Sequence, residues 1–233
     1  MHTLLPTSLF VLLGLLAGAT TSSAGIAGLS NADSVGGLRD ALIQGSGKAV
    51  SQLGTADGFL GNPKVRIPLP DSLRKIERGL KFMGMGDEAD QLVTSMNRAA
   101  EMAVQEASPV LVDAVRKMSI RDAKDILTGG DTAATEYFRR TTADRLTRKF
   151  LPIVQQMTAK VQLAEQYNSL AGRGEKLGLV KSEDANIDSY VARKALDGLF
   201  VVIGDQERAM RQDPVGAATG LARKVFGALE GGQ

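Results

Sequence analysis

Two residue types that carry much of enzyme chemistry are nearly missing from this sequence. The chain of 233 residues has no cysteine, and its single histidine is His2. The rest of the chain therefore cannot form a Ser–His–Asp or Cys–His nucleophilic site, a zinc site built on these residues, or an iron–sulfur or haem site held by them. It also lacks the Glu-x-x-His pairs of di-iron bundles. We expect no metal site and no cofactor, and any catalysis near neutral pH would use carboxylates, Lys, Tyr, Ser or Thr.

An excess of charge of either sign is also absent. The chain has 28 basic and 26 acidic residues, which gives a formal net charge of +2. So even a balance does not predict nucleic acid as a partner. The hydrophobic content of 43% argues against a disordered chain. We expect a folded domain, and composition leaves its partner unknown.

The first 24 residues resemble a secretory signal peptide. Residues 9–19 are an unbroken apolar run, which is shorter than the roughly 20 residues needed to span a bilayer. Small residues follow at Ser22, Ser23 and Ala24, so we place signal cleavage after Ala24. No Lys or Arg precedes the run, which leaves an uncleaved anchor or a disordered N-terminus as alternatives. No second apolar run follows, so we expect no transmembrane helix in the mature chain.

The remaining chain has the length of one domain. Residues 25–34 are small and polar and are expected to form a flexible tail. Residues 35–233 are expected to form a single all-helical domain. Because the chain has no cysteine at the cleavage site, it is not expected to be a lipoprotein.

Apolar residues recur at spacings of three and four, which predicts an all-α bundle of about seven to nine helices. No stretch alternates between apolar and polar residues for five positions without a proline. One helix is expected from Asp71 to Met83, with Gly84 as the left-handed residue just past its end. Ser119 and Asp122 resemble a capping box at the start of another helix.

The second half of the chain has weaker helix boundaries. Asp131 is expected to cap a helix that begins at Thr132 and breaks at Thr141–Thr142. A longer helix then continues to about Ala171, with Pro152 expected to kink it or to lie in its first turn. We expect a loop over 172–182, a helix over 186–212, and a last helix after Asp213–Pro214.

One segment, residues 58–70, does not have a helical pattern. Val65, Ile67 and Leu69 alternate with polar residues or prolines, and Pro68 and Pro70 remove two backbone donors that an interior strand would need. We therefore expect an extended arm whose three apolar side chains are buried on the helical body, with Arg66 exposed.

The densest basic stretch is the best candidate for a binding site. Five basic residues lie within 139–149, namely Arg139, Arg140, Arg145, Arg148 and Lys149. If one helix passes through them, Glu136, Arg140, Asp144 and Arg148 form an alternating-sign stripe, which is most often a solvated face. The other interpretation is an anion site formed by Tyr137, Arg139 and Arg140, because an arginine fork holds a phosphate or carboxylate by two hydrogen bonds.

Carboxylates offer a second, catalytic interpretation. Glu101 and Glu106 flank the end of an apolar helix, and a further acidic group, Glu183, Asp184 and Asp188, precedes another helix. Acids are common in first helical turns for electrostatic reasons alone. Their positions are therefore only weak evidence for acid–base catalysis.

Several motifs along the chain resemble the bacterial domain-of-unknown-function family 4197. They include Gly58-Phe59-Leu60-Gly61-Asn62-Pro63, Ile67-Pro68-Leu69-Pro70, Met96-Asn97-Arg98-Ala99-Ala100-Glu101, Gly130-Asp131-Thr132-Ala133-Ala134-Thr135, Gln166-Tyr167-Asn168 and Lys194-Ala195-Leu196-Asp197-Gly198-Leu199-Phe200. The resemblance implies a protein of a Gram-negative-type cell envelope. It implies no particular activity, and the missing cysteine favours a soluble periplasmic form.

We therefore expect an exported, periplasmic helical protein that binds a partner or a small anionic ligand without catalysis. An envelope component is the expected kind of partner. The alternative is a hydrolase of the peptidoglycan type that uses carboxylates. A shallow groove in the structure would favour the binding protein, and a deep pocket with converging buried carboxylates would favour the hydrolase.

Overall fold

The regular elements of this protein are helices throughout the part that the structure describes. The computed structural model describes residues 31–74, 84, 86–178 and 180–213. Its elements are α1 (Asn31–Leu53), α3 (Gly86–Val104), α4 (Ala107–Lys117), α5 (Ile120–Thr128), α6 (Ala133–Thr158), α7 (Gln162–Lys176), the 3-10 helix η2 (Ser182–Asp184) and α8 (Ile187–Gln212). The predicted all-α fold class is confirmed.

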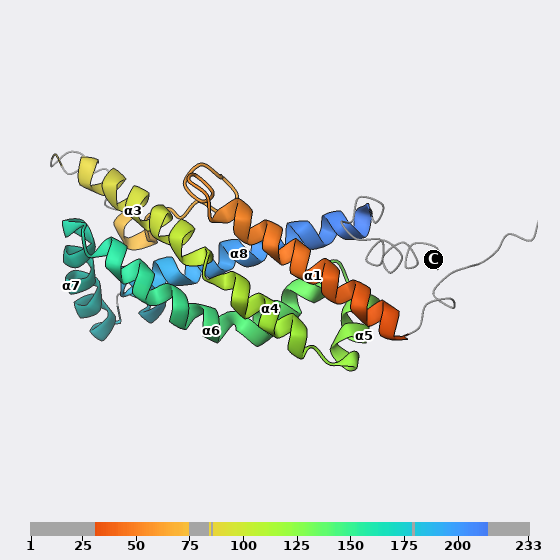
Figure 1. Ribbon diagram of the computed structural model, residues 1–233. Helices are drawn as coiled ribbons and strands as arrows, with labels where there is room; N and C mark the ends of the chain where they lie inside the picture. The colour runs from red at the N-terminus through yellow and green to blue at the C-terminus, as the bar shows by residue number, and fades with distance from the viewer. Residues whose placement is uncertain (1–30, 75–83, 85, 179, 214–233) are drawn as a thin grey trace, which may run out of the picture.

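The described helices form an elongated bundle (Figure 1). The colours of Figure 1 show α1, α3 with α4, α6 and α8 running along its long axis, each in the opposite direction to the one before. α5 lies at one end and α7 at the other. α6 packs against both α3 and α8, and α1 packs against α4 and α8. The core therefore lies between the long helices, and the short helices close the two ends.

Some predictions fall on residues that the structure does not describe. The expected signal peptide with Ala24, residues 25–30 of the expected tail and the helix expected after Pro214 all lie outside the described residues. So do residues 75–83 of the helix expected from Asp71, although Gly84 beyond it has the predicted left-handed backbone, with φ of 80°. None of the described helices combines the length and the apolar composition that crossing a bilayer requires.

Two helix starts are capped by neighbouring side chains, of which only the capping box of Ser119 and Asp122 was predicted. The Ser119 hydroxyl accepts a hydrogen bond from the Asp122 backbone N–H, and the Asp122 carboxylate accepts one from the Ser119 N–H. This is the predicted capping box at the start of α5. At α8, the Asn186 side chain accepts from the Ser189 N–H. Local sequence therefore determines where these two helices begin.

The predicted break at Thr141–Thr142 is wrong, because α6 passes through both residues. Their hydroxyl groups donate to the carbonyls one turn earlier, at Tyr137 and Phe138, so they add to the helical bonding instead of interrupting it. Pro152 lies inside α6. The helix ends at Thr158, before the predicted end at Ala171.

The loop predicted over 172–182 is also partly wrong. α7 continues to Lys176 and includes both Gly172 and Gly174. Its buried residues Leu163, Ala164, Tyr167 and Ala171 lie on one face, so packing against the bundle end outweighs the helix-breaking tendency of the glycines. At the other end of the chain, α1 begins at Asn31, inside the segment predicted as a tail.

The segment over 58–70 has no helix or strand among its residues. Val65, Ile67 and Leu69 are 7, 1 and 5% exposed, and Arg66 is exposed, as the alternation predicts. Two side chains of the bundle bond its backbone. Asn97 of α3 accepts from the Ile67 N–H (2.8 Å) and donates to the Ile67 carbonyl (2.9 Å), and Tyr190 of α8 donates to the Pro68 carbonyl (3.0 Å).

Phe59 lies near the start of this segment and packs against the backbone of α8. Phe59 is fully buried, and a Cβ added to Gly198 would lie 2.7 Å from its ring and 3.2 Å from the Cβ of Val65. Both distances are shorter than ordinary carbon contacts, so a glycine at position 198 lets the segment approach the helix.

Replacing Gly198 with alanine should therefore destabilise the protein by about 1–2 kcal/mol, because overpacking outweighs the better helix propensity of alanine. Gly204 on the same helix is the matched control, since its added Cβ would lie 3.5 Å or more from any neighbour. Gly204→Ala should be neutral or stabilising by up to about 1 kcal/mol. Urea unfolding measures both, and equal effects would show that the contact at Gly198 is not tight.

Candidate functional site

The residues of the predicted anion site lie on three sides of α6. Tyr137 is 4% exposed, and its hydroxyl donates to the Ala114 carbonyl at 2.8 Å. Arg139 pairs with Asp197 at 3.2 Å and lies over the Phe200 ring, while Arg140 pairs with Asp122 at 3.5 Å and lies over the Tyr137 ring. The structure therefore does not direct the three polar groups at one point.

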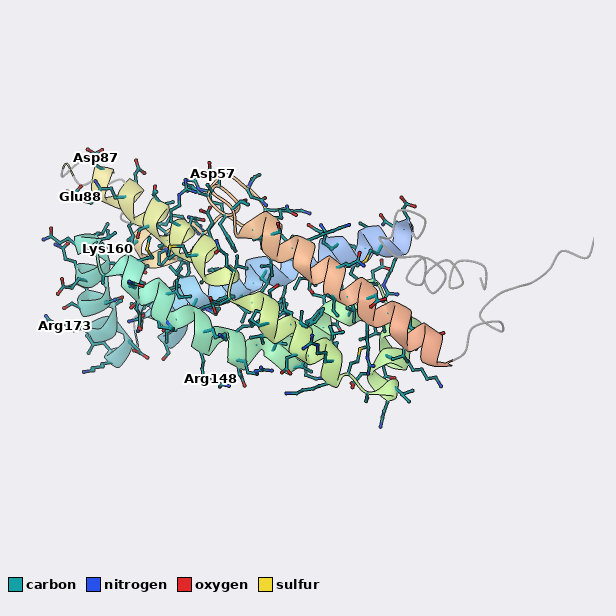
Figure 2. All side chains as sticks on the ribbon, viewed as in Figure 1. Asp57, Asp87, Glu88, Arg148, Lys160 and Arg173 are labelled. Atoms are coloured by element: carbon teal, nitrogen blue, oxygen red, sulfur yellow. The ribbon has the colours of Figure 1, made fainter. Side chains whose placement is uncertain are left out.

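The rest of the basic stretch also faces acids of neighbouring helices. Arg145 pairs with Asp113 at 2.7 Å, and Lys149 pairs with Glu106 at 3.3 Å. Arg148 points outward from the bundle in Figure 2. This arrangement fits the solvated face that the alternating charges indicated. Anion binding there stays a prediction, and it would require the pairs of Arg139 and Arg140 with Asp197 and Asp122 to open.

Glu101 is a buried carboxylate that bonds the turn at the start of the segment over 58–70, where residues 58–61 and 63–65 form turns in place of the predicted extended arm. It is 4% exposed, and one of its oxygens accepts from the backbone N–H groups of Phe59 and Leu60, both at 3.1 Å. Its other oxygen pairs with Arg98 at 2.7 Å, and Arg98 also bonds Asp57 at 2.9 Å. Both oxygens are occupied, which gives Glu101 a structural role and leaves it poorly placed for proton transfer.

Glu207 is a second buried carboxylate, and it caps a helix from a distance. It lies on α8 and is 3% exposed, and it accepts from the N–H groups of Ala134 and Thr135 (both 2.9 Å) and from the Thr135 hydroxyl (2.8 Å). Arg211 pairs with it at 2.9 Å. The predicted cap Asp131 is wrong, since the residue before α6 is Thr132 and its side chain makes no capping bond.

The third buried carboxylate, Asp188, lines a cavity. The cavity has a volume of about 450 Å³ and lies where α6, α7 and the start of α8 meet. Its lining residues are Gln155, Thr158, Ala159, Ala164, Glu165, Asn168 and Asp188. Asp188 is 9% exposed and its Oδ1 accepts from the Thr158 hydroxyl at 2.5 Å.

Hydrogen bonds between the elements around this cavity hold them together. Asn168 of α7 accepts from the Ile187 N–H at 2.7 Å, which holds α7 against the start of α8. The Tyr167 hydroxyl of α7 donates to the Asp184 carbonyl and lies 2.9 Å from the Ser72 hydroxyl. The cavity exists because α6 ends at Thr158, which the sequence pattern did not indicate.

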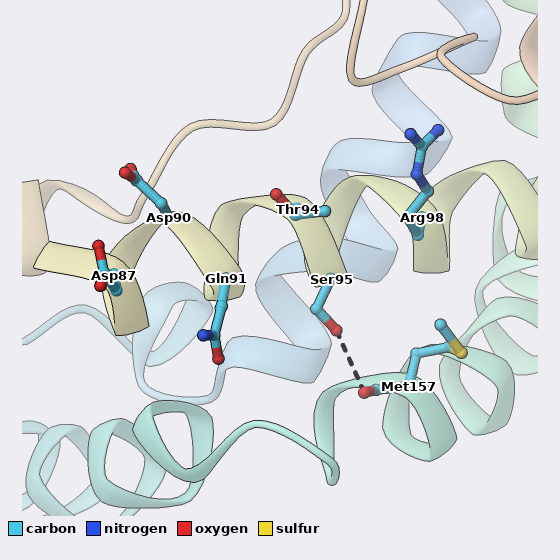
Figure 3. A pocket seen from close by; sticks show the side chains of 7 residues that line it. All are labelled: Asp87, Asp90, Gln91, Thr94, Ser95, Arg98 and Met157. Atoms are coloured by element: carbon cyan, nitrogen blue, oxygen red, sulfur yellow. Dashed lines mark hydrogen bonds between the residues drawn. The ribbon is translucent and has the colours of Figure 1, made fainter.

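A second hollow lies along α3, and it differs in having no buried polar group. Its volume is about 540 Å³, and its lining residues are Asp87, Asp90, Gln91, Thr94, Ser95, Arg98 and Met157. In Figure 3, Gln91 and Ser95 point toward the helix that carries Met157, and the Ser95 hydroxyl donates to the Met157 carbonyl at 3.2 Å. Asp87 and Asp90 are exposed. This groove therefore resembles a solvated helix face more than a formed site.

No group of acidic residues within the described part of the chain could hold a metal ion. The acids predicted as a possible catalytic group are not brought together as a set either. Asp184 pairs with Arg193 at 2.8 Å, and Asp188 faces the cavity. Glu101 and Glu106 serve separate contacts, one buried and one with Lys149.

The three tyrosines of the chain should lose their hydroxyl protons at a higher pH than free tyrosine. Burial raises the pKa of Tyr137, Tyr167 and Tyr190, and it raises that of Tyr190 to about 12. The folded chain holds these protons more tightly than the unfolded chain, whose tyrosine pKa is about 10. The free energy of unfolding should therefore fall as the pH rises from about 10 to about 12. Below about pH 10 the protonated tyrosines contribute their full stabilisation.

Ultraviolet absorbance can follow this titration, since the chain has no tryptophan. At about pH 10 the chain in concentrated urea should be half converted to tyrosinate, and the folded chain should show little of it. Tyrosinate that forms near pH 10 while the helical circular dichroism stays intact would contradict the buried positions of the three rings.

Comparison with known proteins finds a matching family but no matching individual protein or structure. A family model described as "Protein of unknown function (DUF4197)" matches residues 28–227. No curated protein and no solved structure matches the chain. The match covers most of the chain, including every described helix, and brings no assigned ligand or catalytic residue with it.

Proposed function

The chain belongs to the DUF4197 family of proteins of unknown function, and from this premise we propose that it is an exported, periplasmic binding protein without catalytic activity. Export is supported by the short apolar run over 9–19 and by the small residues before Gly25. Binding is supported by one cavity with a buried polar group. The absence of catalysis is supported by the hydrogen bonds and ion pairs that already engage the buried carboxylates.

Export has a direct test in the native host. Mass spectrometry of the protein from the periplasmic fraction should find Gly25 at the N-terminus, because signal peptidase would cut after Ala24. A cytoplasmic chain that still carries residues 1–24 would overturn this part of the proposal and leave the binding site unaffected.

The observation that carries the binding role is the cavity between α6, α7 and α8. Its volume of about 450 Å³ lies within the range of small-molecule sites. Its walls come from three helices that are bonded to one another, so the shape exists before a ligand arrives. Preformed shape lowers the ordering cost of binding.

Catalysis is disfavoured by the environment of the carboxylates. Glu101 and Glu207 have their oxygens engaged by backbone amides and arginines. Asp188 has one oxygen engaged by the Thr158 hydroxyl.

Filling the cavity tests the binding role. The protein would be screened by thermal unfolding against neutral, anionic and cationic small molecules, beside a variant in which Ala159, at the cavity wall, is replaced by phenylalanine. A ligand that binds only the folded state raises the melting temperature. We expect such a rise in the parent chain and none in Ala159→Phe. No rise with any compound, or equal rises in both proteins, would overturn the proposal.

A carboxylate-dependent hydrolase is the second candidate, because two carboxylates, Asp188 and Glu165, line the same cavity. Hydrolysis of glycosidic bonds uses a pair of carboxylates on either side of the bond. Peptidoglycan fragments incubated with the protein and analysed by chromatography distinguish the two functions. Turnover that disappears in both Asp188→Asn and Glu165→Gln would establish the hydrolase, whereas we expect no turnover.

A further inference from the structure

The cavity between α6, α7 and α8 contains a carboxylate with one oxygen open to a ligand. Asp188 is 9% exposed, and its Oδ1 accepts the Thr158 hydroxyl. Among the described residues, no group donates to its other oxygen, Oδ2, and Oδ2 is not one of the fully buried atoms left without a partner. Oδ2 is therefore accessible at the cavity that Asp188 lines, where water or a ligand can donate to it.

The cavity has the charge of a site for a cation. Asp188 and Glu165 line it, and neither Lys nor Arg is among its lining residues. Gln155 adds a side-chain carbonyl, while the Asn168 carbonyl is already used by the Ile187 N–H. The remaining acceptors suit a group with several N–H donors, which an ammonium group has.

The apolar part of the wall limits the rest of the ligand. Ala159 and Ala164 line the cavity; Ala159 is exposed at its rim, and Ala164 is 2% exposed. Small aliphatic side chains leave room for a short hydrocarbon chain and offer it no hydrogen bond. A metal ion is a poorer match, because calcium needs six or more oxygen ligands and magnesium an octahedral set.

We propose that this cavity binds a small organic amine, with the protonated amino group on Asp188 and the hydrocarbon part against Ala159 and Ala164. The proposal rests on the binding function proposed above and gives it a ligand class. The amine would bind at a different place from the anion predicted at the basic stretch.

Three probes of equal chain length separate charge from shape. Butylammonium, 1-butanol and butyrate would each be titrated into the protein and followed by the backbone amide NMR signals of Thr158, Asn168 and Asp188. We expect butylammonium to shift these signals at concentrations where butanol and butyrate do not. Signals of α5, at the opposite end of the bundle, serve as the internal control.

Variants of the two carboxylates test where the amine binds. Asp188→Asn keeps an acceptor for the Thr158 hydroxyl and should lower the affinity for butylammonium about ten- to hundredfold, the effect of one charge-assisted hydrogen bond. Asp125→Asn, an exposed acid on α5, should leave it unchanged. Ala159→Phe keeps both charges and should abolish binding by occupying the space.

Each of the other possible outcomes would overturn one specific part of the amine-binding proposal. If butanol or butyrate binds as well as butylammonium and Ala159→Phe removes that binding, the cavity is a ligand site and the amine class is wrong. If Asp188→Asn binds butylammonium as the parent does, the carboxylate is not the anchor. If none of the probes shifts the cavity signals, the amine proposal fails, while the wider thermal screen decides on the binding function separately.

Discussion

Glu207→Ala should lower the free energy of unfolding by about 3–5 kcal/mol, the range for removing one partner of a buried ion pair. The substitution removes the acceptor of two backbone N–H groups and one hydroxyl at the start of α6, and it leaves Arg211 without its buried carboxylate. Because Thr132 makes no capping bond, no local side chain replaces the lost acceptor. Urea unfolding followed by circular dichroism measures the change.

Asp205 is the matched control for this variant, because it lies on the same helix and also pairs with basic residues. Its partners Lys64 and Arg208 are both substantially exposed, so Asp205→Ala should cost less than about 1 kcal/mol. A Glu207→Met and Arg211→Met double variant should stay strongly destabilised, since the amides of α6 remain unpaired. Recovery in that double variant would assign the role of Glu207 to the ion pair instead of the cap.

Ile67→Asp should have a comparable or larger effect, above about 4 kcal/mol, because it removes a fully buried apolar side chain and introduces a charge in its place. Ile67 is 1% exposed, and its backbone is held in position by Asn97. Arg66 is exposed, and its side chain makes no hydrogen bond or ion pair with the described residues, so Arg66→Asp should change the stability by about 0.5 kcal/mol or less.

The two variants place the same aspartate side chain at adjacent positions, one buried and one exposed. If Ile67→Asp does not fold, Ile67→Val keeps the comparison measurable and should cost about 0.5–1.5 kcal/mol. Small and equal effects of Ile67→Asp and Arg66→Asp would mean that the segment over 58–70 is loosely held in solution.

The features that sequence predicted well depend on near neighbours along the chain. The capping box of Ser119 and Asp122 and the left-handed Gly84 each depend on a few adjacent residues. The alternation of Val65, Ile67 and Leu69 was likewise sufficient to predict which of them are buried.

The features that sequence missed depend on distant partners. Glu101 and Glu207 are ordinary helix acids in the sequence, and their capped amides lie about 40 and 70 positions away. The cavity at Asp188 could not be predicted because it requires α6 to end at Thr158, which no glycine or proline marks. The basic stretch was conspicuous in sequence, and the acids that pair with it come from other helices.

The segment over 58–70 also imposes an order on folding. Tyr190 bonds Pro68 across 122 positions, and Lys64 pairs with Asp205 across 141. Contacts of such high contact order close late, and here they wait for α8, the last described helix to leave the ribosome. A nascent chain that ends before Ile187 has neither the Gly198 surface for Phe59 nor the donor for Pro68. Under the proposed export, this late closure would leave residues 58–70 undocked until synthesis is nearly complete.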